Sequence, residues 1–171
     1  KGGTFVLRIE DTDQNRYVEG SEDYIQEALE WCGMSPDEGP KNKGKYGPYR
    51  QSERKSIYAK HIQTLLKNGA AYYAFDKTEQ LNEERKEAEK KGQTFKYSNQ
   101  NRLRFKNSLT LTEKETAEAL KKDFVIRLRV EPDETVIVKD IIRGVVRVET
   151  NSLDDKILMK SDGMPTYHFA N

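Results

Sequence analysis

Cysteine and histidine are scarce in this chain of 171 residues, which contains one cysteine and two histidines. Cys32 alone cannot form an internal disulfide, and no Cys/His cluster has the spacing of metal ligands, so we expect no zinc. No apolar run is long enough to span a bilayer, and no apolar signal segment is present. These absences together predict a protein of the reducing cytoplasm.

Motifs for nucleophilic catalysis and for phosphate loops are missing as well. Neither His61 nor His168 has a Ser or Cys placed to form a recognisable nucleophilic arrangement. No P-loop and no G-x-G-x-x-G stretch occurs. We therefore expect any catalysis by this chain to work through positioning and charge.

Charge of one sign is not in excess, because 30 Lys and Arg residues balance 29 Asp and Glu residues. Two stretches, 39–55 and 91–112, are nevertheless basic, with aromatic residues between the charges. This combination suits a phosphate backbone and unstacked bases, although ordinary solubilising loops share it. The candidate nucleic-acid-binding residues are Arg50, Arg54, Arg102, Arg104 and Lys106 in these stretches, together with Arg16, which lies outside them.

The first part of the chain alternates between strand and helix patterns. Residues 4–10 carry apolar side chains on both faces, which predicts a mostly buried strand that suits a parallel sheet. One helix is predicted from an N-cap at Ser21 to a stop at Gly33, and another from about Ser52 to Gly69. The first helix is expected to bury Tyr24, Ile25, Ala28, Leu29 and Trp31. The short strand AAYYAF follows, and the order indicates part of an α/β domain.

The chain changes character after residue 76. The stretch TEQLNEERKEAEKKG predicts a polar, solvated helix, and Thr112 with Glu115 forms a capping box for a short helix. FVIRLRV, ETVIVKD and GVVRVET alternate apolar and polar residues, as antiparallel strands with one wet face do, and KILMK reads as a further strand. A mainly antiparallel unit is thus predicted between α/β segments.

The strand over residues 4–10 runs directly into Glu10, Asp11 and Asp13, with Arg16 close behind. In open α/β sheets, ligands bind beyond the carboxyl ends of the strands. Carboxylates at such an end can receive an ammonium group or hold Mg²⁺ through water. The alternative is a local Asx-type turn in which Arg16 pairs with a neighbouring aspartate.

Three motifs together resemble the bacterial glutamyl-tRNA synthetases: LRIEDTD at 7–13, GPYRQSER at 47–54 and SDGMPTYHFAN at 161–171. Their order and separation also fit that family. The flanking stretches VEGSEDYIQEALEWCG and LDDK extend the likeness over nearly the whole chain. None of the motifs is specific alone, but the set is.

The resemblance implies the α/β fold class, with a partial Rossmann-like class I synthetase catalytic domain and an inserted α+β domain that binds the tRNA acceptor end. The implied division is 1–72 for the first catalytic part, 73–155 for the insertion and 156–171 for the return into the catalytic domain. The family uses ATP and Mg²⁺ to activate L-glutamate as glutamyl-adenylate, then transfers the glutamyl group to the 3′ end of tRNA(Glu). We expect the full-length protein to be monomeric.

The resemblance also implies roles for single residues. Glu10 resembles the carboxylate that receives the substrate's α-amino group, while Tyr167 and Asn171 resemble residues lining the glutamate pocket. The two aspartates after Glu10 then shape the turn, with Asp13 and Arg16 as a pair. The HIGH-type and KMSKS-type ATP motifs of class I enzymes do not occur here, so we assign no catalytic residue and expect the isolated chain to be inactive.

The chain departs from many relatives at Ala74-Phe75-Asp76, where they carry a zinc-binding C-x-C. This departure, and the length of the insertion, count against the paralogue that glutamylates queuosine on tRNA. Glutaminyl-tRNA synthetase fits less well, because its strand end usually differs from RIEDTD. A non-catalytic RNA-binding module that uses the two basic stretches is the alternative from another class.

Overall fold

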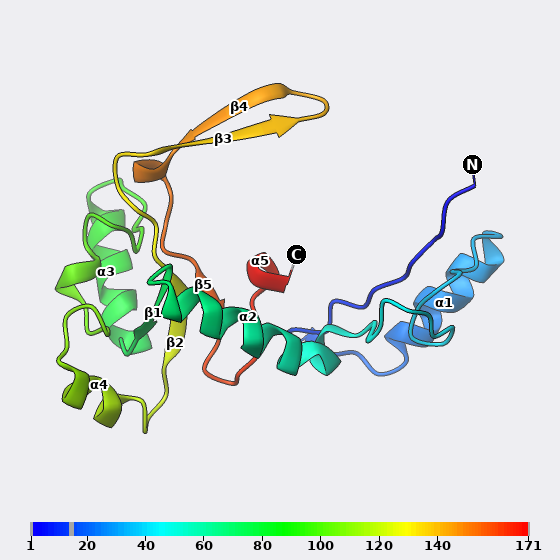
Figure 1. Cartoon of the computed structure of the whole chain (residues 1–171), viewed down its shortest axis with the longest axis horizontal. Coiled ribbons are helices and arrows are strands. Elements are labelled where there is room, and N and C mark those ends of the chain that lie inside the picture. Colours follow the sequence, from blue (N-terminus) through cyan, green and yellow to red (C-terminus); the bar gives the residue numbers. More distant parts are fainter. Residues whose placement is uncertain (1, 14–15, 171) are drawn as a thin grey trace. The chain divides into compact units, whose positions relative to one another are not determined.

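The computed structural model describes residues 2–13 and 16–170. The chain forms two compact units, one from residues 1–60 with 164–171 and the other from residues 61–163. Figure 1 shows the order of the elements along the chain. The division between the units falls within helix α2 (Lys55–Lys67), so this helix contributes residues to both.

The first unit contains α1 (Ser21–Trp31), the 3₁₀ turn η2 (Gln51–Arg54), the first half of α2 and the short helix α5 (Tyr167–Ala170). The predicted strand over residues 4–10 is reduced to two isolated parallel bridges, from Val6 to Glu38 and from Ile9 to Arg50. The expected parallel direction is found, but the expected burial is wrong at Val6, which is 40% exposed. The described partners of this segment are loops rich in Gly and Pro, and loops offer no regular ladder of backbone groups.

Helix α1 begins and packs differently from the prediction. The N-cap is Gly20 in the left-handed conformation, one residue before the expected Ser21, and it offers no side-chain cap. The expected apolar stripe is exposed, with Tyr24 at 72% and Trp31 at 89%, while the buried residue of the helix is Gln26. The helical period is correct, but most of the stripe is uncovered, and only Leu29 among the named residues is half-buried.

The second unit is built on an antiparallel sheet of β1 (Ala71–Ala74), β2 (Val125–Leu128) and β5 (Ile157–Met159), in the order β1-β2-β5. The predicted strands are present, and β2 and β5 pair antiparallel as expected for this part of the chain. We expected β1 to belong to the α/β part, but it pairs antiparallel with β2. Helix α3 (Thr78–Lys90) buries no residue, as its polar sequence predicts. Helix α4 (Glu113–Ala119) begins with the predicted capping box between Thr112 and Glu115. The 3₁₀ turns η3 (Arg102–Arg104) and η4 (Thr150–Ser152) complete the unit.

Strand β5 bears on the expected division of the chain. We assigned residues 156–171 to the returning catalytic segment, but β5 pairs with β2 in the sheet of the second unit. The first unit is formed by two separate stretches of the sequence, which is the pattern of a domain that contains an insertion. The boundaries at 72/73 and 155/156 stay a prediction, and both lie inside the second compact unit.

Strands β3 (Thr135–Asp140) and β4 (Gly144–Glu149) form a separate hairpin, visible in Figure 1 as a two-stranded ribbon. The alternating pattern predicts one buried and one wet face, yet every residue of β3 is exposed. Val136 lies opposite Val148, and Val138 opposite Val146, so the apolar face exists as predicted. It is not buried because no described layer of the unit covers it.

The core of the second unit combines an aromatic cluster with a buried charge pair. Tyr97 stacks on Phe105 with ring centroids 4.6 Å apart. Asp155, with no exposed surface, accepts a hydrogen bond from the Tyr72 hydroxyl at 2.6 Å and lies 3.2 Å from the Arg102 guanidinium. Burial raises the pKa of the Asp155 carboxyl, whereas the donors from Tyr72, Val130 and Arg102 favour its charged form. Burial and the hydrogen bond to Asp155 also raise the pKa of the Tyr72 phenol, which therefore stays a donor.

None of the helices among the described residues combines the length and the apolar character that crossing a bilayer requires.

Replacement of Asp155 by Ala is expected to destabilise the second unit by about 3–5 kcal/mol, because Arg102 is left as an unpaired buried charge. Hydrogen exchange of the β1 and β2 amides, measured in the full-length protein, reports this loss locally. Asp154→Ala is the control: its pair with Lys156 is partly exposed, and its loss is worth no more than about 1 kcal/mol. Equal exchange rates in the two variants would contradict the structural role of Asp155.

Candidate functional site: an acidic strand end held by a buried glutamine

Backbone hydrogen bonds bring the acidic strand end against the GPYRQSER motif. The Ile9 amide donates to the Tyr49 carbonyl at 2.8 Å, and the Gln51 amide donates to the Ile9 carbonyl at 3.1 Å. These two bonds fix the register between residues 9 and 49–51. As a result, the side chains that follow Ile9 meet the side chains at the start of η2.

The Glu10 carboxylate is held from one side. Its Oε1 accepts from the Arg8 guanidinium at 2.6 Å and from the Gln51 side-chain amide at 2.9 Å. No donor among the described residues reaches Oε2. The side chain is 32% exposed, so one carboxylate oxygen is oriented while the other is open to a ligand.

The two aspartates of the strand end have different partners. Asp11 accepts from the Ser52 backbone amide at 2.8 Å and from the Ser52 hydroxyl, so it links the strand end to η2. Asp13 pairs with Arg16 at 2.8 Å, which confirms the expected local pair. The Arg16 side chain is 87% exposed.

Gln51 is fully buried and connects Glu10 to helix α2. Its side-chain oxygen accepts from the Tyr58 hydroxyl, and Tyr58 is 6% exposed. The Tyr58 ring packs on Phe169 of α5, with centroids 5.8 Å apart. Tyr167, the first residue of the same helix, is 62% exposed, whereas Asn171 lies outside the described residues.

The loop between α1 and η2 is fixed by the remaining residues of the motif. Arg50 donates from Nε and Nη2 to the Glu22 carboxylate, both at 2.8 Å, and from Nη1 to Glu53 at 2.9 Å. These hydrogen bonds raise the pKa of the Arg50 guanidinium. Arg54 donates to the Pro48 carbonyl at 2.9 Å. Both arginines are thus engaged in holding the loop, although we expected them to contact RNA.

Tyr49 organises the same loop from inside. Its hydroxyl accepts from the Gly44 amide at 3.0 Å and donates to Glu38 at 2.5 Å. Burial and the bond to Glu38 raise the pKa of the Tyr49 hydroxyl. A Cβ atom at Gly44 would lie 2.2 Å from the Glu38 carboxyl carbon, so any larger residue there would displace the Glu38 side chain that accepts from Tyr49.

The three candidates in the second basic stretch separate into one buried and two exposed residues. Arg102 is 5% exposed and paired with Asp155, so its guanidinium is not available to a ligand. Arg104, two positions further on, is 65% exposed in its side chain, and Lys106 is exposed. The structure therefore leaves Arg104 and Lys106 as the accessible cations of this group.

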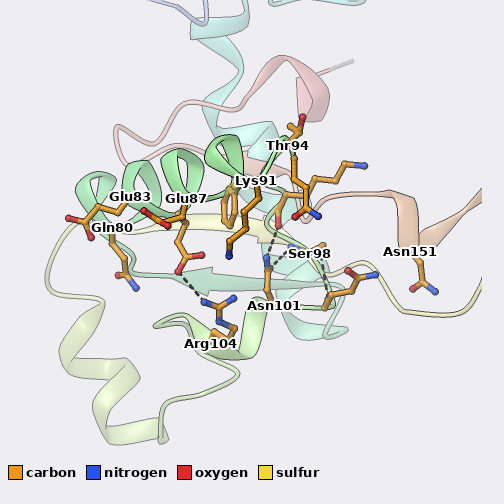
Figure 2. Close-up of a pocket in the computed structure, with 15 residues that line it drawn as sticks. Gln80, Glu83, Glu87, Lys91, Thr94, Ser98, Asn101, Arg104 and Asn151 are labelled. Carbon is orange, nitrogen blue, oxygen red and sulfur yellow. Dashed lines mark hydrogen bonds and ion pairs between the residues drawn. The ribbon is translucent and has the colours of Figure 1, made fainter.

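Arg104 lines a polar pocket of about 610 Å³ between α3 and the segment that follows it. Figure 2 shows Lys91, the residue that follows α3, pointing toward the segment that carries Asn101 and Arg104. The dashed line to Arg104 is its 3.1 Å pair with Glu84. Amides and charges of both signs line the pocket, which suits a polar ligand rather than an apolar one.

Metal ligands do not gather anywhere in the described part of the chain, where no group of three His, Cys, Asp or Glu residues has a suitable arrangement. At the position of the relatives' C-x-C, Ala74 is packed in the aromatic core. Asp76 accepts from the Tyr97 hydroxyl and the Lys106 amide, both at 3.0 Å. These residues already have structural partners.

Comparison with known proteins defines the class of this protein. Residues 1–171 match the family described as tRNA synthetases class I (E and Q), catalytic domain, and the chain belongs to that family. The predicted fold class is confirmed at this level.

The similar curated proteins are glutamate–tRNA ligases. The chain is 58% identical over 172 residues to the ligase of Christiangramia forsetii and 54% identical over 171 residues to that of Flavobacterium johnsoniae. Each match covers 99% of this chain and 34% of the relative, so the chain spans about a third of their length.

Two solved structures are similar as well. The glutamate–tRNA ligase of Elizabethkingia meningosepticum, described as in complex with its amino acid, matches at a TM-score of 0.94 and 54% identity over 99% of this chain and 34% of that one. The synthetase of Elizabethkingia anophelis matches at the same TM-score and identity, and 35% of its length is covered.

Sequence reasoning selected Glu10 but missed the residues that hold it. Gln51, Ser52 and Tyr58 all lie in or just after the GPYRQSER motif, which we used only for its resemblance. The signal in the sequence was that three neighbouring carboxylates need hydrogen-bond donors and that the GPYRQSER motif contains uncharged ones. Nothing in the periodicity of the helix marks Tyr58 as a polar partner rather than a core residue.

Proposed function

We propose that this chain is part of a glutamate–tRNA ligase that activates L-glutamate with ATP, releases pyrophosphate and transfers the glutamyl group to the 3′ end of tRNA(Glu). The ligases that share about half or more of its residues support this proposal over the queuosine paralogue and over a non-catalytic RNA module. ATP and Mg²⁺ are the partners that the class requires. The described residues contain no group of three His, Cys, Asp or Glu side chains that could hold the ion.

The observation that carries the proposal is the Glu10 carboxylate, oriented at Oε1 and open at Oε2. An ammonium group that leaves water for a protein site requires a nearby anion, and this one is already fixed in place. Preorganisation matters because activation requires the substrate carboxylate to face the α-phosphate of ATP in line. We assign Tyr167 and Asn171 to the same glutamate site on the strength of their motif.

The second unit is proposed to contact the acceptor end of the tRNA. Arg104 and Lys106 are its accessible candidates, and the polar pocket beside Arg104 offers amides to sugar and base edges. The cytoplasm, where tRNA is charged, is the proposed compartment, and we propose a monomer. Arg102 is not part of this interface, because it is buried in the core.

Glu10→Gln in the full-length enzyme is expected to lower kcat/KM for glutamate by roughly ten- to a hundredfold. The change removes one charge-assisted hydrogen bond, worth about 1.5–3 kcal/mol, and keeps the shape of the side chain. The KM for ATP should change little. Pyrophosphate exchange at varied glutamate measures the effect.

Asp13→Asn is the matched control, because it also replaces a carboxylate by an amide in the same segment. The Asp13 pair with Arg16 is exposed, so its loss should alter neither the glutamate kinetics nor the melting temperature appreciably. Unchanged glutamate kinetics in Glu10→Gln would remove Glu10 from the substrate site.

The double variant Arg104→Ala/Lys106→Ala is expected to raise the KM for tRNA and to weaken its salt dependence by about two phosphate contacts. The matched control is Arg85→Ala/Lys86→Ala, which removes the same charge from exposed positions of α3 that do not line the pocket. Aminoacylation measured across a salt series compares the two. If both double variants behave alike, Arg104 and Lys106 only add to the net charge.

A further inference from the structure

Gln51 is the buried polar residue between Glu10 and Tyr58. It has no exposed surface, so water does not satisfy its side-chain amide. The amide has two neighbours instead: it donates to Glu10 Oε1 at 2.9 Å, and it accepts from the Tyr58 hydroxyl. A hydrogen-bonded chain thus runs from helix α2 to the strand end.

The direction of this chain follows from the chemistry of the groups. An ionised carboxylate only accepts hydrogen bonds, so Gln51 must present its NH₂ group to Glu10. The amide oxygen then faces Tyr58, whose hydroxyl can donate to it. The Glu10 carboxylate favours this orientation, and the Tyr58 hydroxyl stabilises it by satisfying the amide oxygen. Without that donor, the oxygen would be buried with no partner, and the amide would be held less firmly beside Glu10.

Tyr58 also contacts the segment that carries the other glutamate-site candidate. Its ring packs on Phe169, which lies in α5 two residues after Tyr167. Tyr58 thus connects the segments of the two candidates, because its hydroxyl donates to Gln51 and its ring packs on Phe169.

We propose that Tyr58, acting through Gln51, is a positioning residue that sets the affinity of the site for the ammonium group of glutamate. With Oε1 occupied by Gln51 and Arg8, Oε2 is the oxygen that receives the ammonium group. This inference rests on the proposed function, because it requires Glu10 to bind the substrate. It adds two residues that contact no substrate atom themselves.

Tyr58→Phe in the full-length enzyme removes the hydroxyl and keeps the ring on Phe169. We expect the KM for glutamate to rise roughly three- to tenfold, the range of one uncharged hydrogen bond. The kcat and the KM for ATP should change less than twofold. Tyr24→Phe is the matched control, since its side chain is 72% exposed and lies in the same unit; it should leave every parameter unchanged.

The decisive test is the same change in a Glu10→Gln background. A neutral amide at position 10 can pair with either end of the Gln51 amide, so the Tyr58 hydroxyl no longer matters. Tyr58→Phe should then change the glutamate KM by less than about twofold, and the two effects should be non-additive. A residue that only stabilises the fold would produce the same loss in both backgrounds.

The outcomes separate this inference from the proposed function. If Glu10→Gln itself leaves the glutamate KM unchanged, the substrate site is wrongly assigned and the inference fails with it. If Glu10→Gln is impaired while Tyr58→Phe is normal, only the inference is overturned. The same holds if Tyr58→Phe causes an equal loss in the wild-type and Glu10→Gln backgrounds. Gln51→Met, of similar volume but without the amide, gives a second reading: it should raise the glutamate KM at least as much as Tyr58→Phe. A normal KM in Gln51→Met would equally overturn the inference.

Discussion

Three carboxylates within four positions repel one another unless each has its own donor, and this constraint shapes the first unit. The donors to Glu10 and Asp11 come mainly from one motif, through the Gln51 side chain and through Ser52. Asp13 is satisfied locally by Arg16. The cross-link from the strand end to η2 fixes the start of α2, and with it the position of Tyr58. Tyr49 and Arg50 hold the loop of residues 38–50, which leads into η2, through their bonds to Glu38 and Glu22.

Burying an uncharged amide beside a carboxylate has an energetic logic. A lysine at position 51 would neutralise Glu10 and compete with the substrate's ammonium group for it. An apolar residue would leave Oε1 without a buried partner, and the carboxylate would turn toward solvent. A glutamine orients the carboxylate without adding a second cation to Arg8, which already pairs with the same oxygen. The arrangement restricts the geometry of Glu10 and leaves Oε2 for the ligand.

Periodicity predicted most of the helices and strands, with residues 4–10 as an exception, but it did not predict what covers them. The stripe of α1 and the valine face of the β3–β4 hairpin are both real, and neither is buried. Alternation shows that a segment has an apolar face. Whether another element covers that face depends on long-range packing. The antiparallel pairing of β1 with β2 was not predicted, because the pattern of β1 does not show which strand it pairs with, and its place after two helices suggested an α/β segment.

The site was predictable only where charge made it conspicuous. Glu10 stood out as a carboxylate at a strand end, whereas Gln51 and Tyr58 have no such signal. Arg102 and Arg104 show the same limit, since the sequence treats them alike and a single 3₁₀ turn sends one inward to Asp155 and the other to the surface. Local sequence cannot distinguish them, because the difference arises from a partner more than fifty positions away.

The central claim is that Glu10 binds the substrate ammonium group through the oxygen that Gln51 does not occupy. A crystal structure of the full-length enzyme with L-glutamate bound tests it most directly. We predict the ammonium nitrogen within hydrogen-bonding distance of Glu10 Oε2, roughly 2.7–3.2 Å, with Gln51 still donating to Oε1 and Tyr58 to Gln51. Glutamate bound with its ammonium group on other residues, or a Gln51 amide turned away from Glu10, would contradict the account.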